Sequence, residues 1–392
     1  MRLLEGLTVV SLEQAVAAPF CTRHLADHGA RVIKVERPGA GDLARGYDRT
    51  VKGLASYFVW LNRGKESVTV DVKTPAGAEV LARLVARADV VVQNLAPGAA
   101  SRLGLDHATL AAGNPRIIVA DISGYGDGGP YRDKKAYDLL IQAEAGLVSV
   151  TGSPEVPSRC GVSIADTAAG MYAYSGVLTA LLARERTGRG ARVEVSMLEA
   201  LAEWMGQPLY YVHYGQRPQP RNGATHPTIA PYGPHRAGDG CEVIFGLQNE
   251  REWATFCREV LRQPELARDP RFGSNSERVA NRAALTPIVE QAFAGMTAEA
   301  VVALLDRAGI ANGRINDMDG VAAHPQLAAR GRWRDVGTSA GPVKALLPPA
   351  NVDGVDYAMG DVPALGQHTD PILTWLGYGP AEIAAMRAQG AI

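Results

Sequence analysis

The chain has 392 residues, of which 46% are hydrophobic and 21% are charged, a composition typical of a globular protein long enough for two or three compact units. Lysine and arginine total 40 against 41 aspartate and glutamate residues, which gives a net charge of -1. This balance excludes the strongly basic surface that nucleic acids and anionic membranes attract, so small molecules are the expected partners.

The residue pattern predicts neither a metal site nor a disulfide framework. The four cysteines, Cys21, Cys160, Cys241 and Cys257, lie far apart and form no CxxC pair, so reduced, buried thiols are expected. The eight histidines show no metal-ligand spacing, and no tightly bound cofactor is predicted. The first residues do not resemble a signal peptide, and no apolar run reaches about 18 residues. A cytoplasmic location is therefore expected.

The first half of the chain alternates β-branched runs with helical runs. Buried strands are predicted, in chain order, at residues 7–12, 31–36, 67–72, 89–95 and 116–123. A helix is predicted to begin at Pro75, because Val80, Leu81, Leu84 and Val85 recur at the spacing of one helical face. This alternation predicts a parallel α/β sheet.

A long apolar helix is predicted from Ile164 to about Arg184, and a strand at 191–197 completes the large sheet. Residues 216–234 are rich in Pro, Gly and Asn and are interpreted as a linker. The predicted organisation is a large Rossmann-like parallel-sheet domain at 1–215, completed by 325–392, and a linker with a smaller α+β domain at 216–324.

Three glycines, Gly124, Gly126 and Gly129, match the GxGxxG pattern of dinucleotide-binding proteins directly after a predicted strand. That pattern should open a helix, but the segment Pro130 to Lys135 that follows has no amphipathic period. A surface loop is therefore the preferred interpretation.

Asp166 is a single carboxylate near the start of a long apolar helix. It could cap that helix by accepting hydrogen bonds from free backbone N–H groups. It could also act as a nucleophile, because a helix N-terminus favours the ionised form that nucleophilic attack requires. The spacing alone leaves both interpretations open.

Basic residues stand at the ends of several predicted strands or in the loops that follow. They are Arg37, Lys73, Arg102, Lys134 and Lys135. Each alone is explained as a solvated surface charge. Together they stand where the ligand crevice of an open parallel sheet lies, and a polyphosphate ligand would need such charges.

Five segments in a fixed order carry a family resemblance that covers nearly the whole chain. They are GLTVVSLEQAVAAPFCTRHLADHGARVIKVERPGAGD, LNRGKESVTVDVKTPAG, VVQNLAPGAASRLGL, KKAYDLLIQAEAGL and GVSIADTAAGMYAYSGVLTALLARERTGRGARVEVSM. These segments resemble the class III CoA-transferases, a family that includes formyl-CoA:oxalate, carnitine and succinyl-CoA transferases as well as α-methylacyl-CoA racemase.

The resemblance implies roles for particular residues. The nucleophilic aspartate of the family corresponds to Asp166. The CoA-binding positions correspond to Val16, Ala17, Arg37, Val70, Lys73, Asn94, Leu95, Arg102, Lys135, Ala136, Tyr137 and Asp138. The resemblance also implies a homodimer of interlocked chains, with an acyl-CoA and a free carboxylic acid as substrates.

The implied mechanism is covalent and passes through an acyl-aspartyl anhydride and an aspartyl-CoA thioester. Oxalate-using members carry glutamine at the position of Val16 and a run of glycines where this chain reads RNGATHPTIAPYG. The chain instead resembles members that use succinyl-CoA with four- to six-carbon dicarboxylic acids. Malate, citramalate, itaconate, mesaconate and glutarate are the expected acceptors.

Two other functions compete with CoA transfer. Family racemases need a proton donor and acceptor and place a histidine where this chain has Tyr137, a poor substitute at neutral pH. A CoA-binding protein without turnover would have lost Asp166, which is present. Arg45, Arg159 and Arg221 are candidates to hold the second carboxylate of an acceptor, whereas His226 is interpreted as structural.

Overall fold

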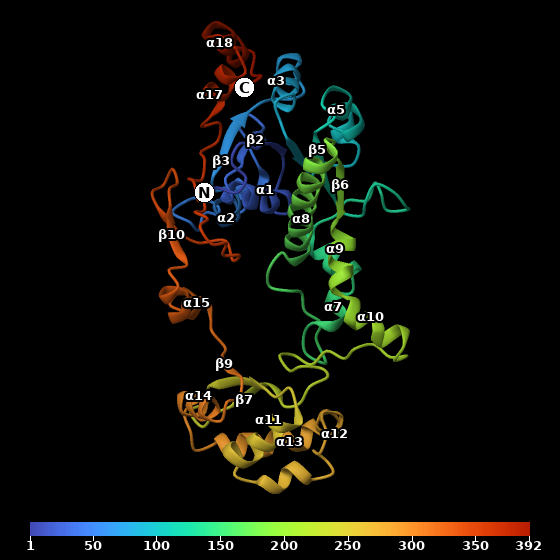
Figure 1. Ribbon diagram of the computed structural model, residues 1–392, viewed down its shortest axis with the longest axis vertical. Helices are drawn as coiled ribbons and strands as arrows, with labels where there is room; N and C mark the ends of the chain where they lie inside the picture. Colours follow the sequence, from blue (N-terminus) through green and yellow to red (C-terminus); the bar gives the residue numbers. More distant parts are fainter. The chain divides into compact units, whose positions relative to one another are not determined.

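The computed structural model describes all residues 1–392, which form two compact units (Figure 1). The first comprises Met1–Gly146, Cys160–Gly206 and Gln326–Ile392, and the second comprises Leu147–Arg159 and Gln207–Pro325. Residues 147–159 pack with the second unit because the guanidinium of Arg221 donates to the carbonyl oxygens of Ser149, Ser153 and Pro154.

A six-stranded parallel sheet forms the centre of the first unit, as the sequence predicts. Its spatial order is β3-β2-β1-β4-β5-β6. The strands are β1 (Thr8–Leu12), β2 (Arg31–Glu36), β3 (Lys65–Thr69), β4 (Val90–Gln93), β5 (Ile118–Ser123) and β6 (Arg192–Ser196). The strand order reverses between β1 and β4, and open sheets of this kind bind ligands at that point.

β3 is displaced from its predicted range of 67–72. The strand ends at Thr69, and the Val70 N–H still donates to the Glu36 carbonyl at the end of β2. The chain then leaves the sheet, because the Asp71 N–H donates to the Ala391 carbonyl and the Asp71 carbonyl accepts from the Thr74 N–H in a turn. The Thr74 hydroxyl then caps the helix α3 (Pro75–Val85), which begins at the predicted Pro75.

Alternate side chains of the strands pack on opposite faces of the sheet. Val10, Ile33, Val91 and Val119 pack against one helical layer. This layer consists of α3, α5 (His107–Gly113), α17 (Thr369–Trp375) and α18 (Pro380–Ala388). The opposite face is covered by α1 (Ala17–Asp27) and α8 (Ile164–Thr187).

Helices α1 and α8 approach each other closely at Gly170. A Cβ atom there would lie 2.6 Å from the Ala17 carbonyl oxygen and 3.1 Å from Phe20 Cβ. Because Gly170 is one helical turn after Asp166, this contact places the start of α8 beside the start of α1.

The first unit also contains a short hairpin, β10 (Trp333–Val336) and β11 (Val343–Leu346). Its remaining helices are α2 (Ser56–Asn62), α4 (Ala99–Arg102), α6 (Asp138–Glu144) and α9 (Met197–Trp204), with a 3₁₀ turn at Leu43–Gly46. Elements at the unit boundaries are α7 (Leu147–Val150), α10 (Gly206–His213), α15 (Met318–Ala322) and α16 (Pro325–Ala329).

The second unit has its own antiparallel sheet and its own core. The sheet order is β7 (Tyr232–Arg236), β8 (Glu242–Gly246) and β9 (Asn312–Arg314). Phe245, Trp253, Phe293 and Leu305 belong to a continuous apolar cluster on this sheet. The cluster draws its residues from α11 (Glu250–Thr255), the π-helical turn Phe256–Val260, the 3₁₀ turn Pro264–Arg268, α13 (Arg282–Phe293) and α14 (Ala298–Arg307). The short helix α12 (Asn275–Ala280) precedes α13. This sheet confirms the expected smaller α+β fold.

By length and composition no single helix qualifies as a membrane span, and the one pair that meets the criteria jointly, α13 with α14, is bent by 103°.

A buried ion pair ties α1 to the end of α2. The guanidinium of Arg63 donates to Asp27 at 2.8 and 2.7 Å, and Arg23 lies 3.7 Å from the same carboxylate. Removing one member of such a pair leaves the other charge buried and unpaired, which is far more costly than breaking an exposed pair.

Asp27→Ala is therefore expected to lower the free energy of unfolding by about 3–5 kcal/mol, measured by urea-induced unfolding. The control is Glu79→Ala, which breaks the exposed pair with Arg83 and should cost roughly 0.3–0.5 kcal/mol. Equal losses in the two variants would show that the Asp27 pair does not stabilise the unit in this way.

Candidate active site

A cleft of about 820 Å³ opens at the carboxyl ends of β1, β4 and β5, where the strand order reverses. Its walls come from residues 14–17 after β1, 93–98 after β4 and 122–126 around the end of β5. The starts of α6 and α8 contribute Asp138 and Asp166. The cleft therefore lies where open parallel sheets bind their ligands.

Asp166 is the third residue of α8, and its carboxylate accepts no hydrogen bond within the protein. The helix is capped instead by another residue, because Asp138 Oδ1 accepts from the N–H groups of Ala165 at 2.8 Å and Asp166 at 3.3 Å. The preceding Ser163 makes no side-chain cap. The interpretation of Asp166 as the helix cap is therefore wrong, and its carboxylate faces the cleft unpaired.

The electrostatic environment raises the proton affinity of Asp166. Burial, and then the negative charge of Asp138, raise the pKa of Asp166 to about 7. A carboxylate that is desolvated and lacks hydrogen bonds is a better nucleophile than one in water, since less solvation must be removed before it attacks. Asp166 can thus exchange between its neutral and ionised forms near neutral pH.

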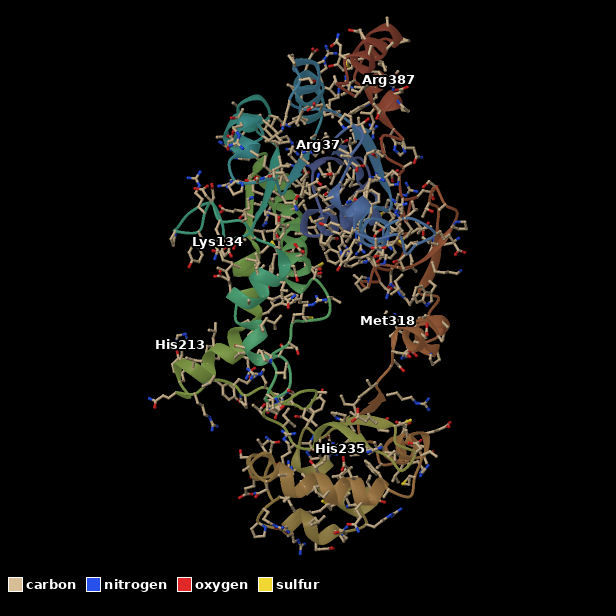
Figure 2. All side chains as sticks on the ribbon, turned by 180° about the vertical axis from the view of Figure 1, so that it is seen from behind. Arg37, Lys134, His213, His235, Met318 and Arg387 are labelled. Atoms are coloured by element: carbon tan, nitrogen blue, oxygen red, sulfur yellow. The ribbon has the colours of Figure 1, made fainter.

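Most of the positions predicted to bind CoA line this one cleft. They are Val16, Ala17, Asn94, Leu95, Lys135, Ala136, Tyr137 and Asp138. Four others lie outside its lining. Arg37, Lys73 and Arg102 are exposed at the end of β2, before α3 and at the end of α4, and Val70 is buried in the core at 2% exposure. Figure 2 shows Arg37 well apart from Lys134, which lies on the loop before α6.

The Asn94 side chain is engaged with the loop after β1. Its Oδ1 accepts from the Gln14 N–H and its Nδ2 donates to the Gln14 carbonyl, both at 2.9 Å. Asn94 therefore joins the ends of β1 and β4 across the point where the strand order reverses.

Two tyrosines in the cleft were not found from the sequence. The Tyr57 hydroxyl lies 3.2 Å from Ser163 Oγ at the start of α8. Burial, and then the charges of Asp42 and Asp166, raise the pKa of Tyr47, so this phenol remains a hydrogen-bond donor at neutral pH. No local pattern marked either residue, because each reaches the cleft through contacts between elements distant in the chain.

The wall at β5 and β6 carries a second set of charges that no sequence pattern marks. Arg192 Nε donates to Asp121 at 2.8 Å, and its two terminal nitrogens lie 3.1 Å from Asp127 and 3.3 Å from Glu194. The pairing depends on the parallel register of β5 with β6, which local periodicity does not specify.

The glycines of the GxGxxG match form a loop. Gly124 and Gly126 line the cleft, but the next helix, α6, begins only at Asp138. Gly124 is needed for packing, because a Cβ atom there would lie 2.2 Å from Ala136 Cβ. The preference for a loop over a dinucleotide-binding helix start is confirmed.

Two of the arginines considered for an acceptor carboxylate are engaged elsewhere. Arg45 donates to both oxygens of Glu36, at 2.8 and 2.7 Å, and to the Pro363 carbonyl. Arg221 holds the carbonyl oxygens of residues 149–154. Neither guanidinium is free to receive a substrate in this conformation. Arg159 is exposed and is the last residue of the segment 147–159, which belongs to the second unit.

His226 also lies in the second unit. Its ring stacks on Tyr232 with a centroid distance of 5.1 Å, and its Nδ1 accepts from the Thr228 N–H at 3.2 Å. These contacts anchor the loop that leads into β7.

Comparisons with known proteins agree with this geometry. Residues 4–369 match the family model of CoA-transferase family III. The acetyl-CoA:oxalate CoA-transferase of Acetobacter aceti is 38% identical over 83% of this chain and 84% of the relative. The succinyl-CoA:glutarate CoA-transferase of Mus musculus is 35% identical over 100% of this chain and 91% of the relative.

A solved structure shows the same fold. The crystal structure of a CAIB/BAIF family protein from Brucella suis superposes with a TM-score of 0.83 and 36% sequence identity, covering 95% of this chain and 99% of that one. Both the family match and the relative from Mus musculus span nearly all of the sequence. The chain therefore belongs to CoA-transferase family III and is a CoA-transferase.

Proposed function

We propose that this enzyme transfers CoA from succinyl-CoA to a free dicarboxylic acid of four to six carbons, with Asp166 as the covalent nucleophile. Glutarate, itaconate, malate, citramalate and mesaconate are the acceptors considered. The observation that supports the proposal is the Asp166 carboxylate, which lies in the cleft without a hydrogen-bond partner. The similarity to a succinyl-CoA:glutarate transferase supports the donor and the acceptor class.

The transfer proceeds in four balanced steps. An Asp166 carboxylate oxygen attacks the thioester carbonyl of the donor, and the C–S bond breaks to give an acyl-aspartyl anhydride and the CoA thiolate. The thiolate attacks the Asp166 carbonyl carbon, which releases the donor acid and forms an aspartyl-CoA thioester. The acceptor carboxylate attacks this thioester and expels the thiolate, and the thiolate then attacks the acceptor carbonyl to regenerate Asp166.

The cleft residues are suited to holding the ligand through these steps. Lys134, which pairs with Glu144, and Lys135 line the cleft and are proposed to supply positive charge for the ligand. The exposed cations Arg37, Lys73 and Arg102 are proposed to contact the phosphates of CoA. The side chain of Arg102 lies over Gly98, which lines the cleft. We also propose that the active enzyme is a homodimer.

Racemase activity is less well supported by the geometry. It requires two groups that can exchange protons with the α-carbon from opposite sides. The Asp138 carboxylate is instead engaged by backbone N–H groups of α8 and by the Gln142 side chain at 2.6 Å. Tyr137, beside it, occupies the position of the histidine in family racemases.

Asp166→Ala is expected to reduce CoA transfer by roughly 10⁴-fold or more, because removal of a covalent nucleophile abolishes the first step. Purified protein is incubated with succinyl-CoA and each candidate acid, with oxalate included, and the new CoA esters are identified chromatographically. CoA binding, measured by calorimetry, should persist in the variant. A folded Asp166→Ala protein that still transfers CoA would overturn the proposal, and esters of oxalate alone would overturn the acceptor class.

The pH profile of kcat/KM should fall on its acidic side with an apparent pKa near 7, the value for Asp166 in the free enzyme. The nucleophile must be ionised, so activity rises as pH rises through that pKa. Because the negative charge of Asp138 raises the pKa of Asp166, Asp138→Asn should move this limb to lower pH.

The Asn variant is the matched choice because its amide oxygen can still accept the two N–H groups at the start of α8. An unmoved or upward-shifted acidic limb in Asp138→Asn would contradict this account of the Asp166 environment.

A further inference from the structure

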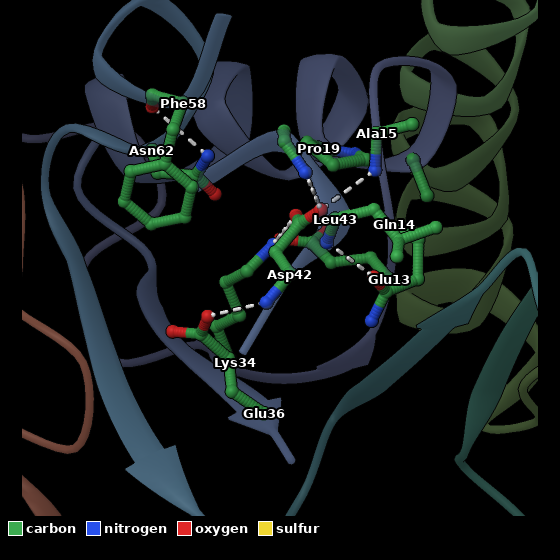
Figure 3. A network of polar contacts seen from close by, with 12 residues as sticks. Glu13, Gln14, Ala15, Pro19, Lys34, Glu36, Asp42, Leu43, Phe58 and Asn62 are labelled. Carbon is green, nitrogen blue, oxygen red and sulfur yellow. Dashed lines mark hydrogen bonds and ion pairs between the residues drawn. The ribbon is translucent and has the colours of Figure 1, made fainter. Parts of the chain in front are cut away.

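A cluster of buried charges lies beneath the wall of the cleft formed by the loop after β1 (Figure 3). We call it the buried charge network. It comprises Glu13, Lys34, Glu36, Asp42 and Lys65, none of which is more than 3% exposed. Arg45 joins it from the rim through Glu36. Three carboxylates thus face three cations.

The network connects three strands of the sheet to the first helix. Glu13 Oε1, at the end of β1, accepts from Lys34 of β2 at 3.2 Å and from Lys65 of β3 at 2.7 Å. Its Oε2 accepts from the Thr22 hydroxyl of α1 at 2.6 Å. Burial alone would raise the pKa of Glu13, but the two lysines outweigh burial and lower it to about 2. The carboxylate is therefore charged at all ordinary pH values.

Such a network is a costly way to stabilise a fold. Charges lose their hydration when they are buried, and apolar residues of similar volume commonly give equal or greater stability. The best-attested role of buried ionic groups is to specify one conformation among several. Fixing the conformation of one segment is therefore a better explanation for this network than stability alone.

That segment is the loop of residues 14–17, and Asp42 makes the connection. Asp42 Oδ2 accepts from Lys34 Nζ at 2.6 Å, which fixes the carboxylate. Asp42 Oδ1 accepts from the Ala15 N–H and the Ala44 N–H, both at 2.9 Å. Figure 3 shows Asp42 between Lys34 and the Ala15 N–H. One carboxylate thus holds the loop after β1 and the 3₁₀ turn at Leu43–Gly46 together.

The loop needs this restraint because its backbone is unusual. Ala15 has φ of 63°, in the left-handed region that residues other than glycine, asparagine and aspartate rarely adopt. A second tether lies beside it, where Gln14 Oε1 accepts from the Leu43 N–H at 2.9 Å. Gln14, Ala15, Val16 and Ala17 all line the cleft, so the backbone that Asp42 holds is part of its wall.

We propose that Asp42, fixed by Lys34, is a positioning residue for acyl-CoA: its Oδ1 holds Ala15 in the left-handed conformation and so places residues 14–17 for the ligand. The inference rests on the proposed function of the cleft as the acyl-CoA site. It assigns Asp42 no direct contact with the reacting atoms.

The test compares two double variants that remove the same buried charges. Lys34→Met/Asp42→Asn keeps an amide oxygen that can accept from Ala15, whereas Lys34→Met/Asp42→Ala leaves that N–H without an acceptor. The asparagine variant should keep the succinyl-CoA KM within about threefold of wild type. The alanine variant should raise the succinyl-CoA KM by about tenfold or more, because a buried backbone N–H loses roughly one hydrogen bond. Its kcat at saturating substrate should change less than its KM.

The control is Arg31→Met/Glu66→Gln, which removes another ion pair between β2 and β3, at 2.8 Å, that does not reach the loop. It should leave the KM unchanged. Hydrogen exchange of residues 14–17 should be faster in the alanine variant than in the asparagine variant. Equal KM values and equal exchange in the two Asp42 variants would overturn the inference.

Gln14→Met serves if the double variants fail to fold, because it removes the tether to Leu43 without changing a buried charge. It should raise the succinyl-CoA KM by roughly threefold and speed exchange at Ala15. No change in either quantity would also count against the inference. Wild-type protein that neither binds CoA nor transfers it would instead overturn the proposed function. Normal transfer by wild-type protein, with a succinyl-CoA KM that the substitutions at Asp42 and Gln14 leave unchanged, would overturn the positioning role alone.

Discussion

The hydrogen bonds from the start of α8 to the Asp138 carboxylate set the chemistry of the cleft. They satisfy the Ala165 and Asp166 N–H groups, which an N-terminal helix turn leaves without partners. Because Asp138 performs the capping, Asp166 remains unpaired in the cleft and carries a pKa raised to about 7 by burial and by its neighbour. One carboxylate is thus structural and the other is available for reaction, and their separate roles follow from which of them the backbone engages.

The parallel sheet brings this pair of carboxylates to the ligand. Reversal of strand order between β1 and β4 opens the cleft, and Gly170 lets α8 lie against the start of α1. Two restraints then hold the loop after β1, Asn94 from β4 and Asp42 from the buried charge network. The backbone of residues 14–17, beside the start of α8, is therefore held from two sides. Such restraint would suit the proposed anhydride intermediate, which must be kept from water.

Local sequence patterns predicted the sheet well, because buried parallel strands are short β-branched runs and the apolar face of α3 has a clear helical period. Asp166 stood out as a candidate from its place on an apolar helix, although only the family resemblance separated nucleophile from cap. The capping role of Asp138, the Tyr57 contact with Ser163, and the packing of α17 and α18 on the sheet join residues far apart in the chain. Local periodicity carries no information on such pairings, so they emerged only from the structure.

The most direct test of the account is whether Asp166 becomes covalently attached to CoA. Wild-type protein is incubated with succinyl-CoA without an acceptor, quenched in acid and digested, and the peptide that contains Asp166 is examined by mass spectrometry beside Asp166→Asn. The account predicts an aspartyl-CoA thioester on Asp166, formed with loss of succinate and discharged when an acceptor acid is added. CoA transfer by wild-type protein with no adduct at Asp166, or with an adduct on another residue, would contradict it.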